Sequence, residues 1–484
     1  MLLFKPLVYG LFIFLMAGFS DVIAQDDYQK WLEKDQKQFN QFLEEEDRAF
    51  SDFLKKDWEA FQTNQGVKAD KAPKPPVMPV VEEKDKPEPP PAETVKPVPP
   101  IKLPEKKPEP RPKPKPVTQK TTNLIQFKYL GAPLSVNYKN DIAFNLTTPI
   151  NNNVISAAWE TMAKSNYKLL IEQLAANKNQ LALNDWGYLG MVGALTRQLF
   201  PQSPNEQNLF AWFVMTKSGY DAKVAYKNEA IYLLLPNEHL IYENRFIVLN
   251  DKKYYFISLT DPIQIDGQIF TYSGQYQGSD KLLRMSVDQV PNLVNEIESK
   301  QLKFSFQGKE YSIPVQLNHD IVTFFKNYPQ TELRIYFDAA VSSPAQYSLA
   351  KSLKPHLDGL SELDAVNFLL RFVQSAFEYK TDDSQFGREK YLMIEETLFY
   401  PGSDCEDRSI LFAYLVRNIL GLRVIGLDYP GHIATAVQFR SEIGGDYLLH
   451  KGEKYLVCDP TYVNADAGMT MPQYKTIDPV VIEL

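Results

Sequence analysis

The chain has 484 residues, of which 44% are hydrophobic and 13% aromatic, so it is long enough to form several folded domains. Its formal net charge of −8 argues against nucleic acid as a partner, because phosphate binding needs Lys and Arg side chains clustered on one surface. Only two cysteines are present, Cys405 and Cys458.

Residues 1–24 predict a signal peptide. The segment MLLFKPLVYGLFIFLMAGFSDVIA has a basic residue, an apolar core and small or apolar residues before a cut after Ala24. A single transmembrane anchor is the alternative, but VIA followed by QDD resembles a processing site. No cysteine lies near the cut, which argues against a lipid anchor. We therefore expect an exported bacterial protein, periplasmic or secreted.

Residues 25–65 carry a repeat with a period of eleven residues, which predicts one long helix. Aromatic residues recur at positions 28, 31, 39, 42, 50, 53 and 61. Eleven residues correspond to about 3.67 residues per turn, so the aromatic side chains form one stripe along a nearly straight helix. A stripe of this kind predicts a buried face but not its partner. It covers the globular part of the same chain, or it docks on another envelope protein through residues 28–61.

Residues 66–119 predict a linker, because Pro, Lys, Glu and Val dominate the segment, as in KPVPPIKLPEKKPEPRPKPKP. A segment of this composition builds no core of its own. We expect an extended spacer of the polyproline type or a disordered tether.

The remaining sequence is of ordinary globular composition, and its last part has the clearest secondary-structure signals. The apolar run Ile410–Gly421 has the spacing of a buried helix that ends at a glycine. The runs LRVIGLDYP, GHIATAVQF and KYLVCDPTY predict three strands that follow this helix. The predicted domain boundaries after the linker are 120–262, then a mainly β connecting region at 263–345, then a catalytic domain at 346–484.

These elements place a thiol, an imidazole and a carboxylate in an order that suits nucleophilic catalysis. Cys405 precedes the helix, His432 begins a strand and Asp459 ends a neighbouring one. A helix N-terminus and a nearby imidazolium lower the pKa of a thiol, and a carboxylate on the other ring nitrogen orients the imidazole. Strand alternation puts Ala434 and Ala436 on the face of His432, where small side chains would let the helix approach the sheet.

The segments SDCEDRSILF, YPGHIATAV and YLVCDPTY resemble the transglutaminase-like branch of the papain-like superfamily, in which Cys, His and Asp occur in this order. The resemblance covers residues from about 350 to 475. It implies an α+β fold with a helix packed on an antiparallel sheet, and it implies that Cys405 is the nucleophile, His432 the general base and Asp459 the orienting carboxylate. The implied activity is that of an exported cysteine peptidase or amidohydrolase acting on peptide or isopeptide amides, without a cofactor. The alternative is a non-catalytic envelope scaffold or binding protein on the same fold.

The acidic residues around Cys405 have a structural interpretation first. Ser403 and Glu406 have the S-x-x-E spacing of a capping box, and acidic side chains are favoured in the first turn of a helix. Similar periplasmic proteinases use carboxylates flanking the cysteine as calcium ligands, which makes Asp404 and Glu406 an alternative metal site. Calcium needs six or more oxygens, and the sequence shows only a few here, so no metal site is assigned.

Two further expectations concern the immediate surroundings of the thiol. A Cys405–Cys458 disulfide is the first alternative in an exported protein, but Cys458 should point to the face opposite Asp459 and serve as a core residue. The backbone N–H of Cys405 supplies one oxyanion donor, and Tyr400 is the candidate for a second.

Residues 120–262 also predict a degenerate copy of the catalytic domain. NLFAWFVMTKSGYDAKV from Asn208 parallels ILFAYLVRNILGLRVIG from Ile410 at a constant offset of 202 residues. In this alignment the three catalytic positions fall near Ser203, Ala230 and Ser258, so the copy lacks all three reactive groups. Chance similarity between helix-to-strand segments is the alternative.

Overall fold

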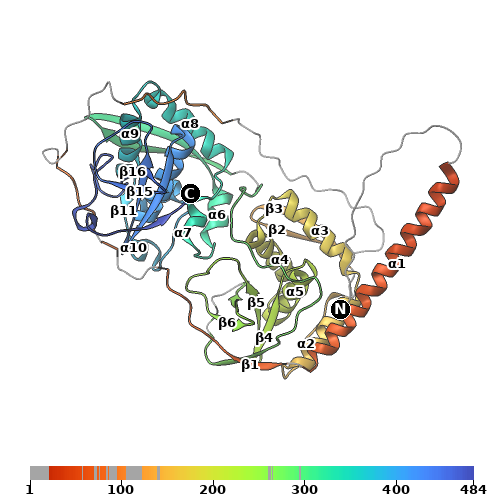
Figure 1. The fold of residues 1–484 in the computed structure, drawn as a ribbon. Coiled ribbons are helices and arrows are strands. Elements are labelled where there is room, and N and C mark those ends of the chain that lie inside the picture. Colours follow the sequence, from red (N-terminus) through yellow and green to blue (C-terminus); the bar gives the residue numbers. More distant parts are fainter. Residues whose placement is uncertain are drawn as a thin grey trace.

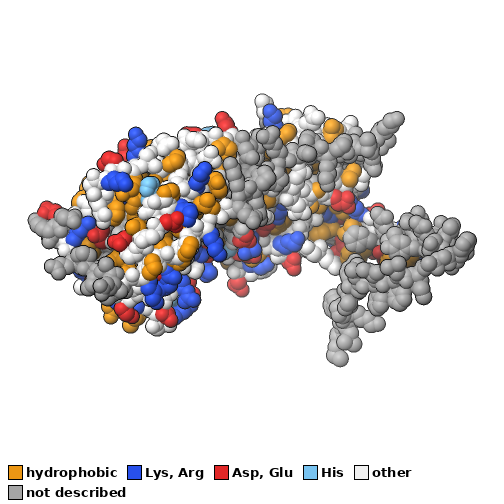
Figure 2. All heavy atoms as spheres, turned by 90° about the horizontal axis from the view of Figure 1, so that it is seen from above, with side chains coloured by type: hydrophobic (Ala, Val, Ile, Leu, Met, Phe, Trp, Pro, Cys, Tyr) orange, Lys and Arg blue, Asp and Glu red, His pale blue; other side chains and the backbone are white. Residues whose placement is uncertain are grey.

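The computed structural model has a mixed α+β architecture with antiparallel sheets and helices packed against them (Figure 1). The structure describes residues 21–56, 58–69, 74–75, 77–82, 86, 95–104, 123–138, 142–259, 263, 265–293 and 296–484. Residues 1–20 of the predicted signal peptide lie outside this set. In the part of the chain that is described, no helix is both long and apolar enough to cross a membrane. The face in Figure 2 shows basic and acidic side chains interspersed among hydrophobic and uncharged surface.

Helix α1 spans Asp21–Leu54 and is shorter than the predicted helix at 25–65. The last aromatic residue of the repeat, Phe61, instead lies in strand β1 (Glu59–Gln62), which pairs with a strand of the first sheet. Trp58 helps to end the helix, because its indole N–H donates to the Leu54 carbonyl at 2.6 Å. The C-terminal end of the stripe packs on the globular part, since Phe50 is 7% exposed, whereas Trp31 and Phe42 are 58% and 44% exposed.

The N-terminal unit contains a hairpin, four helices and a six-stranded sheet. Its helices are α2 (Asn152–Lys164), α3 (Tyr167–Gln180), α4 (Asp185–Leu199) and α5 (Pro204–Lys217). Its strands after β1 are β2 (Asn123–Tyr129), β3 (Ala132–Tyr138), β4 (Lys223–Lys227), β5 (Ala230–Pro236), β6 (Phe246–Leu249), β7 (Lys252–Ile257) and β8 (Gln268–Thr271). The sheet has the order β1-β8-β4-β5-β7-β6, and a bridge between Asn64 and Phe246 brings its two edges together, so the sheet nearly closes into a barrel.

The C-terminal unit begins with the hairpin β9 (Ile297–Phe306) and β10 (Lys309–Asn318). Its helices are α6 (His319–Lys326), α7 (Leu333–Phe337), α8 (Ser343–Leu357), α9 (Glu362–Ser375), α10 (Asp382–Phe386), α11 (Ile394–Phe399) and α12 (Cys405–Leu415), which a π-helical turn extends to Leu420. Its other strands are β11 (Glu378–Tyr379), β12 (Gly402–Ser403), β13 (Arg423–Tyr429), β14 (His432–Gln438), β15 (Tyr447–His450), β16 (Glu453–Cys458) and β17 (Val480–Ile482). The region predicted as mainly β, 263–345, therefore also contains α6 and α7.

The sheets of the two units share a strand order. The C-terminal sheet runs β15-β16-β14-β13-β17, and the four strands β13-β14-β16-β15 follow the same order as β4-β5-β7-β6. The first hairpins also share their register, since Lys227 pairs with Ala230 and Tyr429 pairs with His432. A further strand, β8 or β17, lies antiparallel to β4 or β13 on the side away from β5 or β14.

From Lys74 onward, the described parts of the predicted linker lie against the C-terminal unit (Figure 1). Val67, near the start of the predicted linker, instead contacts the N-terminal unit, where its carbonyl accepts from the Glu243 N–H at 2.7 Å. The Val81 N–H donates to the Val463 carbonyl at 2.9 Å, and the Val98 N–H donates to the Leu360 carbonyl at 3.0 Å. The apolar linker residues Met78, Val81, Val98 and Ile101 are buried in two hydrophobic clusters of that unit. A free spacer or tether is therefore wrong for these residues, because their apolar side chains find a core to enter.

Candidate active site

Helix α12 begins at Cys405, and its first turn is capped one residue later than the sequence predicts. The carboxylate of Asp407 accepts from the Asp404 N–H at 3.3 Å, which makes Asp404 the N-cap. Ser403 and Glu406 do not form the expected capping box: the Ser403 hydroxyl accepts from Arg408 Nε at 3.1 Å, and Glu406 faces the thiol. The Glu406 side chain therefore does not cap the helix.

Arg408 fixes the start of α12 to the rest of the unit. Its side chain is buried and donates to the carbonyls of Gln374 at 3.2 Å and Phe377 at 2.9 Å, besides Ser403. Burial lowers the pKa of the Arg408 guanidinium to about 10. This residue holds α9 and the segment before Cys405 in place.

His432 and Asp459 are brought together as the sequence suggests. The Nε2 N–H of His432 donates to Asp459 Oδ2 at 2.8 Å, and both side chains are buried. Asp459 Oδ1 accepts from the backbone N–H groups of Thr461 at 2.9 Å and Tyr462 at 3.2 Å. Burial opposes ionisation of Asp459, but the His432 charge and these hydrogen bonds outweigh it and lower its pKa.

The second ring nitrogen of His432 is the open position of this pair. Nδ1 is buried and has no hydrogen-bond partner among the described residues. The imidazole stacks on the ring of Tyr474, with centroids 5.0 Å apart and planes at 13°. The ring is therefore held in one orientation from two sides, with Nδ1 unused.

Cys405 is buried and pairs with a carboxylate instead of the imidazole. Its Sγ donates to Glu406 Oε2 at 2.9 Å, and no hydrogen bond joins it to His432 in the described part of the chain. The helix start nevertheless lies beside the start of β14, because the Ser409 hydroxyl, one turn after Cys405, donates to the Ile433 carbonyl at 3.0 Å. Burial, followed by the charges of Glu406 and Asp404, raises the pKa of the thiol well above its ordinary value.

Helix α12 packs on the sheet face opposite to the expected one. Ile433, Val437 and Cys458 share the hydrophobic cluster of α12, whereas Ala434 and Ala436 belong to a cluster on the other face. The alanines therefore do not serve the close approach of the helix. Both cysteines are free, and Cys458 is a core residue, so the disulfide alternative does not hold.

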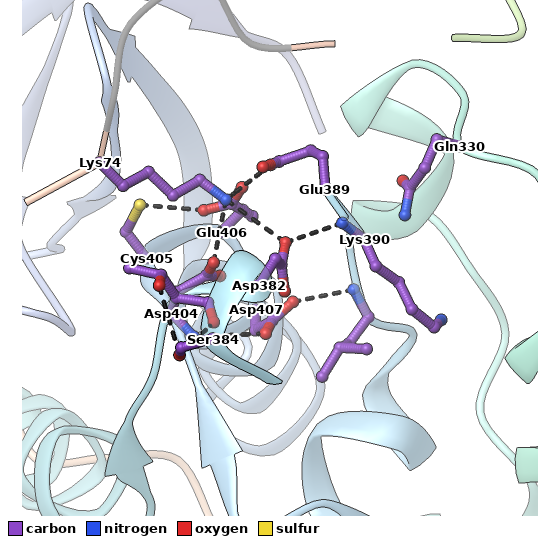
Figure 3. Close-up of polar contacts among 12 residues, drawn as sticks. Lys74, Gln330, Asp382, Ser384, Glu389, Lys390, Asp404, Cys405, Glu406 and Asp407 are labelled. Carbon is purple, nitrogen blue, oxygen red and sulfur yellow. Dashed lines mark hydrogen bonds and ion pairs between the residues drawn. The ribbon is translucent and has the colours of Figure 1, made fainter. Parts of the chain in front are cut away.

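A buried lysine from the linker lies among the acidic side chains next to Cys405 (Figure 3). The Lys74 ammonium forms ion pairs with four carboxylates: Asp382 at 3.5 Å, Glu389 at 2.6 Å, Asp404 at 2.9 Å, and Glu406. We call these four carboxylates the Lys74 pocket. The Lys74 side chain is 7% exposed. Burial alone lowers its pKa, but Glu406 and Asp404 outweigh that effect and raise it above the ordinary value.

The Lys74 pocket carries more negative charge than one ammonium neutralises. Burial raises the pKa of Asp382 and Glu389 to about 7 and that of Asp404 to about 6, although Lys74 opposes each shift. One oxygen of Asp404, Oδ1, is buried without a partner in the described part of the chain. Several of these carboxyls therefore exchange protons near neutral pH.

The calcium alternative does not fit this arrangement. Two groups of carboxylate oxygens, one from Asp382, Glu389 and Glu406 and one from Asp382, Asp404 and Asp407, are close enough together to ligate an ion. However, the ammonium of Lys74 already bonds to members of both groups. A divalent cation and Lys74 compete for the same oxygens.

Tyr379 lies beside the segment that leads into α12. Tyr379 pairs with Ser403, two residues before Cys405, and burial followed by the charges of Cys405 and Asp404 raises the pKa of its hydroxyl. That hydroxyl donates to the Pro75 carbonyl of the linker at 2.9 Å. The ring of Tyr400 instead packs against Phe386 and Phe399.

Sequence reasoning missed Lys74, Asp382, Glu389 and Tyr379 as members of this site. They come from three separate segments with no motif in common, so spacing carries no signal for them. The run VMPVV at residues 77–81 was the available clue, because an apolar stretch in a proline-rich linker needs a surface to cover it.

Comparison of the chain with protein-family models, with curated proteins and with solved structures finds no match. The function is therefore argued from the site alone.

Proposed function

We propose that the protein is a cysteine-dependent acyl-transfer enzyme that hydrolyses peptide or isopeptide amide bonds, with Cys405, His432 and Asp459 as its catalytic residues. The observation that carries this proposal is the His432–Asp459 hydrogen bond of 2.8 Å together with the unused Nδ1 of the same ring. A buried nitrogen without a partner costs free energy, so its retention favours a role in proton transfer.

The proposed reaction begins when the Cys405 thiol turns from Glu406 and passes its proton to His432 Nδ1. The thiolate attacks the amide carbon, and the C–N bond breaks as the Nδ1 proton moves to the leaving amine, which leaves a thioester on Sγ. Water then attacks the thioester, His432 accepts its proton, and the acid leaves as the proton returns to the thiolate. Asp459 keeps the imidazole oriented and stabilises its charged form.

Two groups are candidates for stabilising the developing oxyanion. The backbone N–H of Cys405 lies at the N-terminus of α12, where the helix offers unpaired donors. The Tyr379 hydroxyl, now bonded to the Pro75 carbonyl, replaces Tyr400 as the candidate for a second donor. A carbonyl oxygen of the linker thus occupies a donor that a substrate carbonyl would need.

We further propose that the C-terminal unit has the transglutaminase-like form of the papain-like fold and that the N-terminal unit is its degenerate copy. Shared strand order and hairpin register support the duplication. The positions aligned with the catalytic residues support it too: Ser203 is the N-cap of α5, Ala230 begins β5 and Ser258 follows β7. Export through the signal peptide at residues 1–24 remains part of this proposal.

A non-catalytic envelope scaffold or binding protein is the second candidate. The observation that favours it is the state of Cys405, which is buried, bonded to Glu406 and held protonated by burial and by neighbouring acids. The enzyme needs Cys405 to leave Glu406 and lose its proton, whereas the scaffold does not.

Labelling with an iodoacetamide probe between pH 5 and 9, read separately for each cysteine by mass spectrometry, distinguishes the candidates. Three full-length chains are compared: wild type, Lys74→Ala, and Lys74→Ala with His432→Ala. The enzyme predicts that Lys74→Ala exposes Cys405 to labelling while Cys458 stays unreactive, and that His432→Ala slows the labelling of Cys405 at pH 7 by about tenfold or more. Equal rates with and without His432 favour the scaffold.

A further inference from the structure

The Lys74 pocket is built from one unit, and its occupant comes from another part of the chain. Asp382 begins α10, Glu389 precedes α11, and Asp404 and Glu406 lie at the start of α12. All four carboxylates converge on one ammonium group, as Figure 3 shows. Lys74 reaches them from the linker, which belongs to neither folded unit.

The linker around Lys74 is bound as a peptide is bound by a receptor. Its Pro75 carbonyl accepts from the Tyr379 hydroxyl, and its Pro79 carbonyl accepts from the Val463 N–H at 3.2 Å. The Val81 N–H donates back to the Val463 carbonyl, which makes a short strand-like pairing. Met78 and Val81 enter a hydrophobic cluster of the same unit. A charged pocket, main-chain pairing and apolar contacts are the elements of extended-peptide recognition.

The charge of the pocket exceeds what anchoring a linker requires. One carboxylate is enough to pair one buried ammonium, and each additional buried carboxylate costs desolvation and mutual repulsion. Here four carboxylates meet Lys74, and Asp404 Oδ1 has no partner at all among the described residues although the side chain is fully buried. An excess of buried carboxylates over ammonium groups favours a site that binds a cationic ligand.

We propose that the Lys74 pocket is a subsite for the lysine side chain of a peptide, and that residues 74–75 and 77–81 are an internal occupant which such a peptide displaces. This inference rests on the proposed function only in making that peptide the substrate whose amide lies beside Cys405. The binding itself needs no catalysis.

The test measures binding of the synthetic peptide APKPPVMPVVE, which has the sequence of residues 72–82, labelled with a fluorophore. Its matched control has norleucine in place of the lysine, which keeps the side-chain length and removes the charge. Fluorescence anisotropy with the full-length Lys74→Ala chain at pH 7.5 should give at least tenfold tighter binding of the lysine peptide. Wild type should bind that peptide more weakly than Lys74→Ala does, because the attached segment competes at a high effective concentration.

Equal affinity for the two peptides, or binding of neither, overturns the proposal. Calcium provides a further arm: if the Lys74→Ala chain binds Ca²⁺ and the lysine peptide does not compete with it, the pocket is a metal site and the proposal fails.

A second measurement uses the unchanged chain, so it does not depend on how Lys74→Ala folds. Acetylation by an N-hydroxysuccinimide ester, read by mass spectrometry, should modify Lys74 at least tenfold more slowly than Lys164, whose side chain is 74% exposed. Excess lysine peptide should raise the rate at Lys74, and the norleucine peptide should not. Equal rates at Lys74 and Lys164, or no response to the peptide, contradict the proposal.

The failure of this inference is distinguishable from failure of the proposed function. The binding assay is repeated with Lys74→Ala combined with Cys405→Ser, which has no nucleophile. If this chain binds the lysine peptide preferentially but its Cys405-containing parent transfers no acyl group, the lysine subsite is supported and the proposed enzyme activity is ruled out. Acyl transfer by the parent chain without a preference for the lysine peptide supports the enzyme and rules out the lysine subsite.

Discussion

Lys74 and Cys405 contact the same carboxylate, that of Glu406: Lys74 pairs with Oε1, and the Cys405 thiol donates to Oε2 at 2.9 Å. The position of the linker and the state of the thiol are therefore coupled through one side chain. When Lys74 leaves, Glu406 loses its cation, and the Cys405 thiol loses a positive charge that lowers its pKa.

Removing the charge of Glu406 should make the thiol more reactive. Glu406 is the largest charged contributor to the raised pKa of Cys405, so Glu406→Gln lowers that pKa and weakens the hold on Lys74. We expect alkylation of Cys405 at pH 8 to accelerate by about tenfold, which corresponds to about one pKa unit. Glu395→Gln is the control, because Glu395 is a buried acid that bonds to Ser342 and not to Cys405. Similar rates in both variants would show that Glu406 does not restrain the thiol.

The stability of the protein should fall as pH rises through the range in which Glu395 ionises. Burial raises the pKa of Glu395 from 4.5 to about 7, against the opposing hydrogen bond from Ser342. Between these values the unfolded chain loses its proton and the folded chain keeps it, so stability present below pH 4.5 is lost up to about pH 7. The shift corresponds to at most about 3 kcal/mol.

Urea unfolding of wild type and Glu395→Gln at pH 5 and pH 8 measures this loss. Because glutamine does not ionise, the stability of the variant relative to wild type should rise by about 2 to 3 kcal/mol between the two pH values. A constant difference would mean that Glu395 does not hold a proton in the folded state.

Arg408 should be one of the most sensitive positions of the C-terminal unit. Arg408→Met leaves the carbonyls of Gln374 and Phe377 without their donor in the interior, and we expect a loss of about 3 kcal/mol in the free energy of unfolding. Arg417→Met is the matched control, since Arg417 is 32% exposed and contacts the half-exposed Asp338. Comparable losses at both positions would refute a special role for Arg408.

The buried aromatic residues of α1 should contribute to the stability of the protein, and the exposed ones should not. Phe50→Ala removes a ring that packs against Trp159 at 4.7 Å between centroids, so it should cost about 3 kcal/mol. Phe42→Ala, in the same helix but 44% exposed, should change stability by less than about 0.5 kcal/mol. Thermal unfolding of both variants decides this, and equal effects would contradict the packing described.

The local elements of the C-terminal unit were predictable because their signals are local. The glycine at the end of the π-helical turn, Gly421, has a positive φ of 66°, and the predicted strands correspond to β13, β14 and β16. His432 and Asp459 were placed together because adjacent strands carry them. The registers of β13–β14 and β15–β16 follow from hairpin connections, whereas the pairing of β14 with β16 skips one strand.

The remaining features depend on contacts between distant segments, which periodicity does not encode. Composition predicts that residues 66–119 form no core of their own, but it does not show that Met78 and Val81 enter another segment's core. Alternation places the alanines of β14 on one face, yet the larger Ile433 and Val437 on the other face receive α12. The observed capping box lies one residue after the predicted one, because Asp404 and Asp407 have the same spacing as Ser403 and Glu406.

Whether Cys405 accepts an acyl group with the help of His432 is tested most directly by trapping that acyl group. The Lys74→Ala chain is mixed with p-nitrophenyl acetate at pH 7, release of p-nitrophenol is followed, and the acetylated residue is located by mass spectrometry. We predict a burst of about one equivalent with the acetyl group on Cys405, absent in Cys405→Ser and slowed about a hundredfold by adding His432→Ala. Acetylation of Cys458 or of lysines alone, or equal rates with and without His432, would contradict it.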